Sequence, residues 1–291
     1  MLLITGATGQ LGTAVIQQLL RRTPAHHIAA LVRDERKAAP LSAAGVHVRV
    51  GHYDDPGTLD AAMPGVSTVL LIAGTDEQRR VQQHRNVIEA ARRAGVQCLA
   101  YTSRDLRDPA TLTNTLMLGH VQTEDLIRAS GLNHLIFRNI LYLDAVLNFV
   151  GPDVLDAGIQ LPTGDGRVAF ALRSELGEAI ANALLDEPRG HTTYHLTGSA
   201  AYSFADVAAA LSDLSGRPVK YTPLTTAAFA ERLHARGVPN ALAQRIIGFL
   251  TDIRHGQEDH VTPDLARLLG RPPAGLHDGL ATLFRLPAPH A

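Results

Sequence analysis

The sequence predicts an α/β fold built on a doubly wound parallel sheet, with a smaller, mainly helical C-terminal lobe. Two observations predict it. Short apolar runs alternate with amphipathic helical segments through the first half of the chain, and a glycine-rich turn follows the first apolar run. Strands that are apolar along their whole length are typical of a parallel sheet with helices on both faces. The 291 residues are enough for one large domain or two small ones.

The predicted strands of the first half are six short apolar runs, at residues 2–5, 28–32, 46–50, 68–73, 97–102 and 134–138. Most of the segments between them have helical periodicity. Leu11, Val15 and Leu19 recur at helical spacing, as do Val81 and Ile88 in a later segment. Right-handed crossovers between parallel strands then give a doubly wound, Rossmann-like sheet.

The second half of the chain has a different pattern. It predicts a hairpin around Gly164–Gly166, a helix over about residues 174–185, strands at 192–198 and 219–224, and two or three closing helices. Ser203 is expected to cap the helix that follows it, and Gly216 is expected to end that helix. We expect this mainly helical lobe to close over the carboxyl edge of the sheet.

Composition excludes several classes of function. The formal net charge is −1 and no long basic run is present, which argues against nucleic acid as a partner. Cys98 is the only cysteine, so no internal disulfide can form, and its apolar surroundings favour a buried, inert thiol. No apolar run approaches the ~18 residues of a membrane span, and no charged leader precedes the first strand. We therefore expect a cytoplasmic protein without a membrane partner.

The glycine-rich turn contains Gly6, Gly9 and Gly12, directly after the first predicted strand and at the start of the first predicted helix. In such a turn the first glycine permits a tight bend, the second lets the backbone approach a pyrophosphate, and the third lets the helix pack close to the strand. The phosphates meet the positive end of the helix dipole. This context favours a dinucleotide site over a turn with a structural role alone.

The residues after the second predicted strand bear on the choice of dinucleotide. NAD enzymes usually have an acidic residue here for the ribose 2′-hydroxyl, whereas a basic residue favours the 2′-phosphate of NADP. The strand is followed by Arg33, with Asp34, Arg36 and Lys37 after it. A planar guanidinium donates two parallel hydrogen bonds to a phosphate. The sequence therefore predicts NADP(H) over NAD(H), with a solvated basic turn as the alternative interpretation.

Six segments together resemble a known family: ITGATGQLG (4–12), AALVRD (29–34), QHRNVIEAARRAGV (83–96), AYTS (100–103), TEDLIRASGL (123–132) and FRN (137–139). The chain resembles the NmrA-like family of atypical short-chain dehydrogenases/reductases, and within it the bacterial type 2 NAD(P)H:quinone oxidoreductases. The first two segments are shared widely across that superfamily, whereas QHRNVI, AYTS and RN are more specific. The resemblance extends over essentially the whole chain.

The resemblance implies which residues bind the cofactor. They are Gly6, Ala7, Thr8, Gly9, Gln10, Leu11 and Gly12 in the phosphate loop, Arg33 after the second strand, Ala73, Gly74 and Thr75 after the fourth, and Arg138, Asn139, Ile140, Leu141 and Tyr142 on the nicotinamide side. We expect an NAD(P)-binding domain over residues 1–139 that also takes in about 168–198. Residues 140–167 and 199–291 are expected to form the smaller substrate lobe.

The usual general acid of the superfamily is not found at its expected place. Typical members have a Tyr and a Lys four residues apart after the fifth strand, and counting back from TEDLIRASG puts these positions on Leu116 and His120. Leucine cannot donate a proton, so alcohol oxidation and sugar epimerisation are disfavoured. A quinone needs mainly orientation of the nicotinamide. Ser103, His120 and Asn139 are the candidates for positioning substrate or nicotinamide, and a capping role is the alternative for Ser103.

The predicted function is therefore NADPH-dependent hydride transfer to a quinone or a similar electrophilic carbonyl compound. The alternative is a non-catalytic NADP(H)-sensing regulator of the NmrA type, which would act on a protein partner. Outward-facing helices of the sheet are candidate homodimer surfaces. No metal site is predicted, because the densest polar group, His255, Glu258, Asp259 and His260, is interpreted as a solvated loop.

Overall fold

The computed structural model describes residues 1–76, 78–186 and 190–286, which divide into two compact units. The first unit consists of Met1–Arg104, Leu116–Asn139 and Arg173–His195. The second consists of Asp105–Thr115, Ile140–Leu172 and the chain from Leu196 on. Each unit is described in turn.

A seven-stranded sheet in the order β3-β2-β1-β4-β5-β6-β8 forms the centre of the first unit. Its strands are β1 (Leu2–Ile4), β2 (Ile28–Val32), β3 (His47–Val50), β4 (Thr68–Leu71), β5 (Cys98–Arg104), β6 (Asn133–Asn139) and β8 (His191–Leu196). Every pair from β3 through β6 is parallel. This order confirms the predicted doubly wound fold, and the predicted strand positions of the first half agree to within a few residues.

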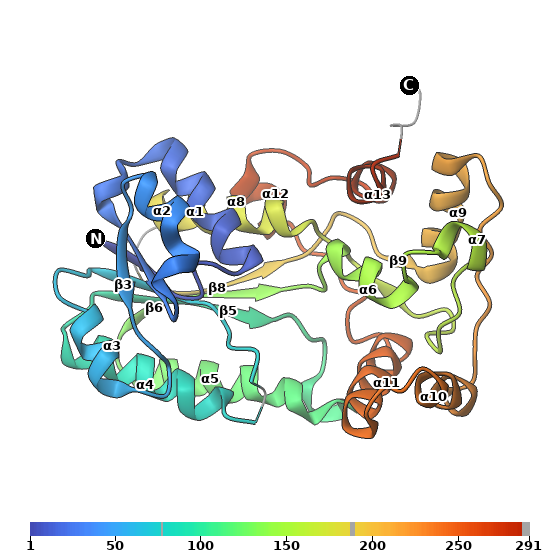
Figure 1. Cartoon of the computed structure of the whole chain (residues 1–291), viewed down its shortest axis with the longest axis horizontal. Helices are drawn as coiled ribbons and strands as arrows, with labels where there is room; N and C mark the ends of the chain where they lie inside the picture. Colours follow the sequence, from blue (N-terminus) through green and yellow to red (C-terminus); the bar gives the residue numbers. More distant parts are fainter. Residues whose placement is uncertain (77, 187–189, 287–291) are drawn as a thin grey trace. The chain divides into compact units, whose positions relative to one another are not determined.

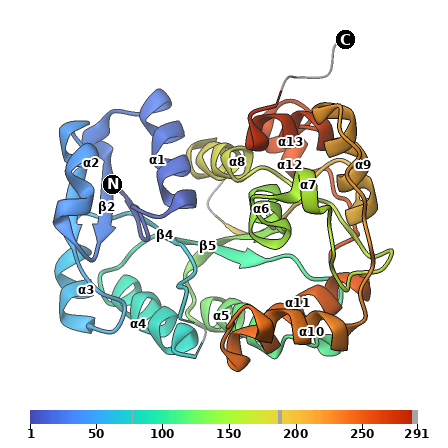
Figure 2. The same cartoon turned by 45° about the vertical axis from the view of Figure 1, so that its right-hand side comes forward.

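Helices cover both faces of this sheet (Figures 1 and 2). They are α1 (Gln10–Arg22), α2 (Ala39–Ala43), α3 (Pro56–Ala62), α4 (Arg80–Arg93), α5 (Leu118–Ala129) and α8 (Arg173–Asp186). On one face α1 packs against α8, where Gly177 lets Ala14 approach closely. On the other face α3, α4 and α5 cover a buried apolar layer that includes Leu3, Leu71 and Leu99. Burial of such a layer is the main source of stability in a fold of this kind.

The second unit is mainly helical, with a short antiparallel pair, β7 (Arg167–Val168) and β9 (Tyr202–Ser203). Its helices are α6 (Val146–Val150), α7 (Val154–Ala157), α9 (Phe204–Ser215), α10 (Thr226–Ala235), α11 (Asn240–Arg254), α12 (Asp264–Leu269) and α13 (Leu276–Phe284). Phe149 stacks on Phe249 at 5.7 Å between ring centroids and meets Phe204 edge-on. Among the described residues, no helix has both the length and the apolar character that a membrane crossing requires.

The predicted ends of α9 are confirmed. The hydroxyl oxygen of Ser203 accepts the Asp206 N–H, and the Asp206 carboxylate accepts the Ser203 N–H, which is a complete capping box. Gly216 ends the helix with φ +67°, a left-handed conformation that favours glycine. The buried Cys98 is also as expected.

Three predictions for the second half are wrong. The turn near Gly164 does not close a hairpin, because Arg167–Val168 pairs with Tyr202–Ser203 while Ile159, before the turn, exchanges backbone hydrogen bonds with Lys220 and Thr222. Residues 219–224 form only an isolated bridge at Tyr221 rather than a strand. In the described part of the chain, four helices rather than two or three follow α9. Both strand errors have one cause: each short apolar run pairs with a partner remote in sequence, which local patterns cannot identify.

Candidate cofactor site

The strand order of the first unit reverses between β1 and β4, and the loops that follow these two strands contain predicted cofactor residues. Gly6–Gly12 follow β1, and Ala73, Gly74 and Thr75 follow β4. In doubly wound sheets, ligands bind outside the carboxyl ends of the strands at such a switch point. The fold therefore brings these two predicted segments to one place.

The glycine turn has the geometry that a phosphate cradle needs. Gly6 has φ +58°, which favours glycine, and its carbonyl accepts the Gly9 N–H at 2.9 Å. A Cβ atom on Gly12 would overlap the Gly6 carbonyl oxygen and lie 2.9 Å from the Cα of Ala7. Because Gly9 at the N-cap has no side chain, the first-turn N–H groups of α1 remain exposed to an anion. The turn therefore fits a dinucleotide pyrophosphate.

A buried hydroxyl joins the loops that follow β1, β3 and β4. The Oγ1 of Thr5 accepts the Ile72 N–H at 3.0 Å and also contacts the hydroxyl of Tyr53. That hydroxyl lies 3.0 Å from the Ile72 carbonyl oxygen, so its one proton is shared between two acceptors. Burial raises the pKa of Tyr53, which keeps the phenol neutral. Sequence reasoning gave neither side chain a role, although Thr5 is the last residue of the first predicted strand and Tyr53 lies three residues after the third.

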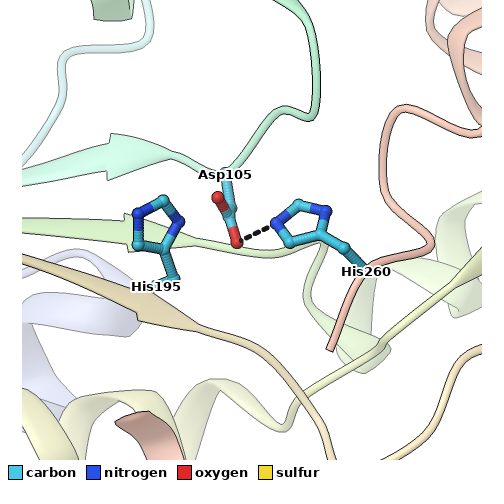
Figure 3. Close-up of side chains that lie close together, drawn as sticks. All are labelled: Asp105, His195 and His260. Carbon is cyan, nitrogen blue, oxygen red and sulfur yellow. Dashed lines mark hydrogen bonds and ion pairs between the residues drawn. The ribbon is translucent and has the colours of Figure 1, made fainter. Parts of the chain in front are cut away.

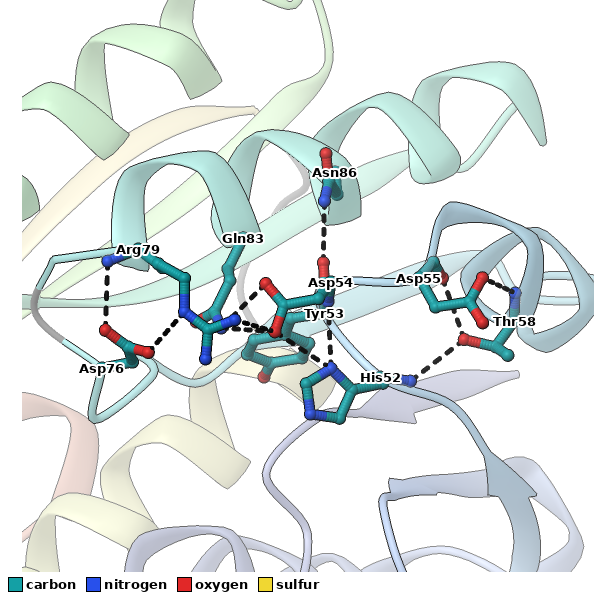
Figure 4. A network of polar contacts seen from close by, with 9 residues as sticks. All are labelled: His52, Tyr53, Asp54, Asp55, Thr58, Asp76, Arg79, Gln83 and Asn86. Atoms are coloured by element: carbon teal, nitrogen blue, oxygen red, sulfur yellow. Dashed lines mark hydrogen bonds and ion pairs between the residues drawn. The ribbon is translucent and has the colours of Figure 1, made fainter.

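Polar side chains of the family segment QHRNVI support the loop after β3 (Figure 4). The amide of Gln83 donates to both carboxylate oxygens of Asp54, at 3.1 and 3.2 Å, and that of Asn86 donates to the Tyr53 carbonyl at 2.8 Å. Arg79 bridges Asp54 and Asp76 at 3.0 and 2.7 Å. Helix α4 thus fixes the loop after β3, whose Tyr53 contacts the residues that follow β1 and β4.

His84, from the same segment, holds the loop after β4. Its Nε2 accepts the Gly74 N–H at 3.0 Å, so the proton of the neutral ring is on Nδ1, which lies 2.9 Å from the Oγ1 of Thr123. The Thr123 hydroxyl in turn donates to the Gly119 carbonyl at 2.7 Å. Burial, helped by the nearby Arg80 charge, lowers the pKa of His84 to about 3. The neutral imidazole is therefore a structural link between Gly74 and α5.

His84 makes the stability of the protein pH-dependent. Its pKa of about 3 in the folded chain lies below the ordinary value of 6.5, so between these pH values the unfolded chain binds a proton that the folded chain does not. The contribution of His84 to the free energy of unfolding is therefore complete above pH 6.5 and is lost as the pH falls toward 3. We expect His84→Gln to reduce the slope of unfolding free energy against pH in that window by about 1.4 kcal/mol per pH unit. Urea unfolding at a series of pH values measures this slope, with the exposed His255→Gln as control. Parallel curves for wild type and His84→Gln would contradict the assignment.

The predicted 2′-phosphate ligand, Arg33, is exposed, and among the described residues it forms no hydrogen bond or ion pair. The neighbouring acid is used differently. Asp34 accepts the backbone N–H of Arg36 at 3.1 Å and its guanidinium at 3.0 Å, and thereby caps the short 3₁₀ helix Glu35–Ala38. The Arg36 guanidinium lowers the pKa of Asp34. Asp34 is thus engaged within its own turn, while the Arg33 guanidinium remains available, an arrangement that fits a 2′-phosphate.

Ser103 and Arg138 both bind one buried carboxylate, that of Glu124, which is 1% exposed. Ser103 donates to it at 2.6 Å, Arg138 at 3.0 and 2.7 Å, and Arg128 at 2.7 Å. Burial acts to raise the pKa of Glu124, but the hydrogen bonds from Arg138 and Ser103 outweigh it and lower the pKa overall. The alternative capping role of Ser103 is wrong, because Ser103 lies within β5 and, among the described residues, its side chain accepts no backbone N–H.

The other two candidates for positioning are also buried in the first unit. His120 lies on α5 with its Nδ1 2.9 Å from the hydroxyl of Tyr101, and Asn139 is the last residue of β6. Burial, then the Arg80 charge, lowers the pKa of His120 well below its usual value, so the ring is neutral at pH 7. Leu116 precedes α5, and its carbonyl accepts a hydrogen bond from Arg80 at 3.3 Å. His120 is therefore not an imidazolium near neutral pH and cannot act as a charged general acid.

The predicted nicotinamide-side residues after β6 belong to the second unit. The Ile140 N–H donates to the Leu196 carbonyl at 3.1 Å, the Leu141 N–H donates to the Glu258 carboxylate at 3.1 Å, and Tyr142 bridges to Ala171. The interpretation of residues 255–260 as a solvated loop is wrong, because Glu258 is buried. Its carboxylate accepts the N–H of Leu141, more than a hundred residues away, and no local sequence signal indicates that contact.

Comparison with known proteins relates the whole chain to nicotinamide-dependent reductases. The model of the NmrA-like family matches residues 1–258. Quinone oxidoreductase 2 of Escherichia coli is 36% identical over 287 residues, covering 98% of this chain and 99% of that protein. The crystal structure of NADPH-dependent quinone oxidoreductase from E. coli with NADPH has a TM-score of 0.91 at 35% identity, covering 98% of this chain and 100% of that one. The NADP(H) complex of Citrobacter sp. triphenylmethane reductase also has a TM-score of 0.91, at 34% identity, covering 97% of this chain and 100% of that chain.

Proposed function

Because this chain belongs to the NmrA-like family, we propose that it is an NADPH-dependent reductase that transfers hydride to a quinone or a similar electrophilic carbonyl compound. The observation that carries the proposal is its likeness, over almost its full length, to a quinone oxidoreductase. The geometry of the switch point and the available Arg33 guanidinium support the choice of cofactor.

The residues of the chain have distinct tasks in this proposal. NADPH, when bound, supplies the hydride. The N–H groups from Gly6 to Gly12 bind its pyrophosphate, and Arg33 binds the 2′-phosphate. His84 and Tyr53 hold the loops that shape this end of the site. Residues Arg138–Tyr142 orient the nicotinamide, and the Glu124 carboxylate fixes the Arg138 side chain while they do so.

Proton transfer in this proposal does not use an acid pair of the Tyr–Lys type. Leu116 and His120 occupy those positions, and the His120 ring is neutral because burial lowers its pKa. The Ser103 hydroxyl directs its proton to Glu124, which leaves its oxygen free only as an acceptor. A quinone takes up protons on its reduced oxygens from water, so orientation is the main requirement of the reaction. This is why an acceptor of the quinone type fits better than an alcohol.

A turnover assay tests the function. Purified protein is expected to oxidise NADPH in the presence of a simple quinone such as menadione, which is measured as a fall in the absorbance of the reduced nicotinamide. NADPH is expected to be oxidised faster than NADH. A series of substituted quinones and an azo dye extends the same assay to related acceptors. Tight NADP⁺ binding by calorimetry without turnover of any acceptor would overturn the enzyme and favour the regulatory alternative with a protein partner.

The two compact units support a division of labour. We propose that residues 1–139, together with about 168–198, form the cofactor-binding domain, and that residues 140–167 and 199–291, apart from Ile140–Tyr142, bind the acceptor. We also propose that the protein acts in the cytoplasm on a small-molecule substrate.

A further inference from the structure

The segment Asp252–His260 of the second unit, here called the brace, holds two other stretches of that unit in place. One is Asp105–Thr115, which directly follows β5 and leads toward α5. The other is the chain after β6, with Leu141. The brace runs from the last turn of α11 into the loop before α12. Several polar side chains of the brace are buried, whereas its composition indicates a solvated loop.

Asp252 clamps the backbone of the first stretch. Its side chain is 3% exposed, and its two carboxylate oxygens accept the N–H groups of Thr113 and Asn114 at 2.6 and 2.9 Å. Gly248, one turn earlier on α11, lies beside the same residue, since a Cβ there would be in ordinary van der Waals contact with the Asn114 backbone, at 3.5 Å. Hydrogen bonds to a carboxylate are roughly twice as strong as neutral ones.

Gln257 continues the clamp along the same stretch. Its amide nitrogen donates to the Asp108 carbonyl at 3.0 Å and the Thr111 hydroxyl at 2.8 Å, and its amide oxygen accepts the Asp108 N–H at 2.9 Å. At the end of the brace, His260 Nε2 lies 2.8 Å from a carboxylate oxygen of Asp105, the first residue after β5 (Figure 3). The stretch is therefore held from Asp105 to Asn114.

Glu258 holds the second stretch. Its side chain is 1% exposed, and its Oε2 accepts the Leu141 N–H at 3.1 Å. Its own backbone carbonyl accepts the Ala169 N–H at 2.9 Å, which anchors the backbone of Glu258. Leu141 is one of the residues predicted to line the nicotinamide, so Glu258 acts on that site through a backbone contact.

We propose that Asp252 and Glu258 are positioning residues for hydride transfer, which keep the chain after β5 and the chain after β6 in one fixed geometry. The proposal rests on the proposed reductase function. Both stretches lack long regular elements of their own, so their backbone geometry depends on these side chains. A misplacement of reacting groups by about 1 Å can cost roughly 100-fold in rate. Neither carboxylate needs to touch the cofactor or the acceptor for this effect.

The variants Asp252→Asn and Glu258→Ala test the proposal, with Glu258→Gln as the conservative replacement. Asparagine has one carbonyl oxygen and places an NH₂ group against the other backbone N–H, whereas glutamine can still accept from Leu141. The matched control is Asp213→Asn, an exposed acid of the same unit that pairs only on the surface with His277. The assay uses the full-length protein with NADPH and menadione.

Asp252→Asn and Glu258→Ala are each expected to lower kcat roughly tenfold or more and to change the NADPH dissociation constant less than about threefold. The isotope effect with NADPH deuterated at the transferred position should rise, because the hydride step becomes slower. Glu258→Gln should recover most of kcat. A loss of folded protein alone would lower kcat with an unchanged isotope effect, and that outcome would overturn the proposal.

Amide hydrogen exchange separates this proposal from the proposed function. Thr113 and Asn114 should exchange faster in Asp252→Asn, and Leu141 should exchange faster in Glu258→Ala, whereas Asp213→Asn changes none of them. If the wild-type protein turns over no acceptor, the proposed function fails. The exchange rates of these amides then still test whether Asp252 and Glu258 hold the two stretches in place. Unchanged exchange at these three amides would overturn the brace.

Discussion

Replacing Arg33 with aspartate is expected to lower kcat/KM for NADPH roughly 10- to 100-fold while leaving kcat/KM for NADH about unchanged. The first effect follows because hydrogen bonds to a charged group contribute about 1.5–3 kcal/mol, and the introduced carboxylate repels the 2′-phosphate. NADH has no phosphate at that position, so it loses nothing. Initial rates with both cofactors and one quinone measure the ratio.

Arg36→Ala is the matched control for this prediction. Arg36 lies three residues away with a side chain 91% exposed, but its guanidinium is paired with Asp34. Its removal should leave the cofactor preference close to that of the wild type. A preference that persists in Arg33→Asp, or that disappears equally in Arg36→Ala, would show that the 2′-phosphate binds elsewhere.

Gly12→Ala is expected to abolish measurable NADP⁺ binding and to destabilise the fold by about 1–3 kcal/mol. The added Cβ would overlap the carbonyl oxygen of Gly6, so α1 must move away from the turn that is proposed to bind the pyrophosphate. The Gly6 oxygen is a backbone atom and the position of a Cβ is fixed by its own backbone, so no side-chain rotation can relieve the clash. Calorimetric titration with NADP⁺ and urea unfolding measure the two effects separately.

Gly275→Ala provides the comparison, because a Cβ at that position meets no atom within 4 Å. It should leave NADP⁺ affinity unchanged and shift stability by no more than the usual cost of an N-cap change. Tight NADP⁺ binding in Gly12→Ala would contradict the close packing between the turn and α1.

The switch-point residues illustrate what local pattern can reveal. Gly6, Gly9 and Gly12 are recognisable because one backbone geometry requires them at one spacing, and Arg33 because a strand end has a known place in the fold. The residues that hold these elements have no such signal. His84 is visible in a family segment, but its bond to Gly74 depends on how α4 packs beside β4. Tyr53 likewise depends on the neighbouring strand order.

Charged side chains show the limit most clearly. Arg138 is predicted to line the nicotinamide, yet its guanidinium binds Glu124, which sequence reasoning did not single out. Glu258 looks like a solvated acid by composition and is buried against Leu141. A carboxylate is buried only where donors satisfy it, and those donors are distant in sequence. Nothing in the neighbouring residues distinguishes such a carboxylate from an exposed one.

By itself the sequence determined the doubly wound sheet and the glycine turn, because apolar periodicity and glycine spacing act over a few residues. The family was indicated by the resemblance of six segments along the chain. Only the tertiary structure decided which polar side chains are engaged: Ser103 with Glu124, Asp34 with Arg36, and Glu258 with Leu141. The physical reason is that a buried polar group requires a specific partner at about 3 Å. Except for Asp34, whose partner is two residues away, those partners come from other elements, and only the folded chain brings them together.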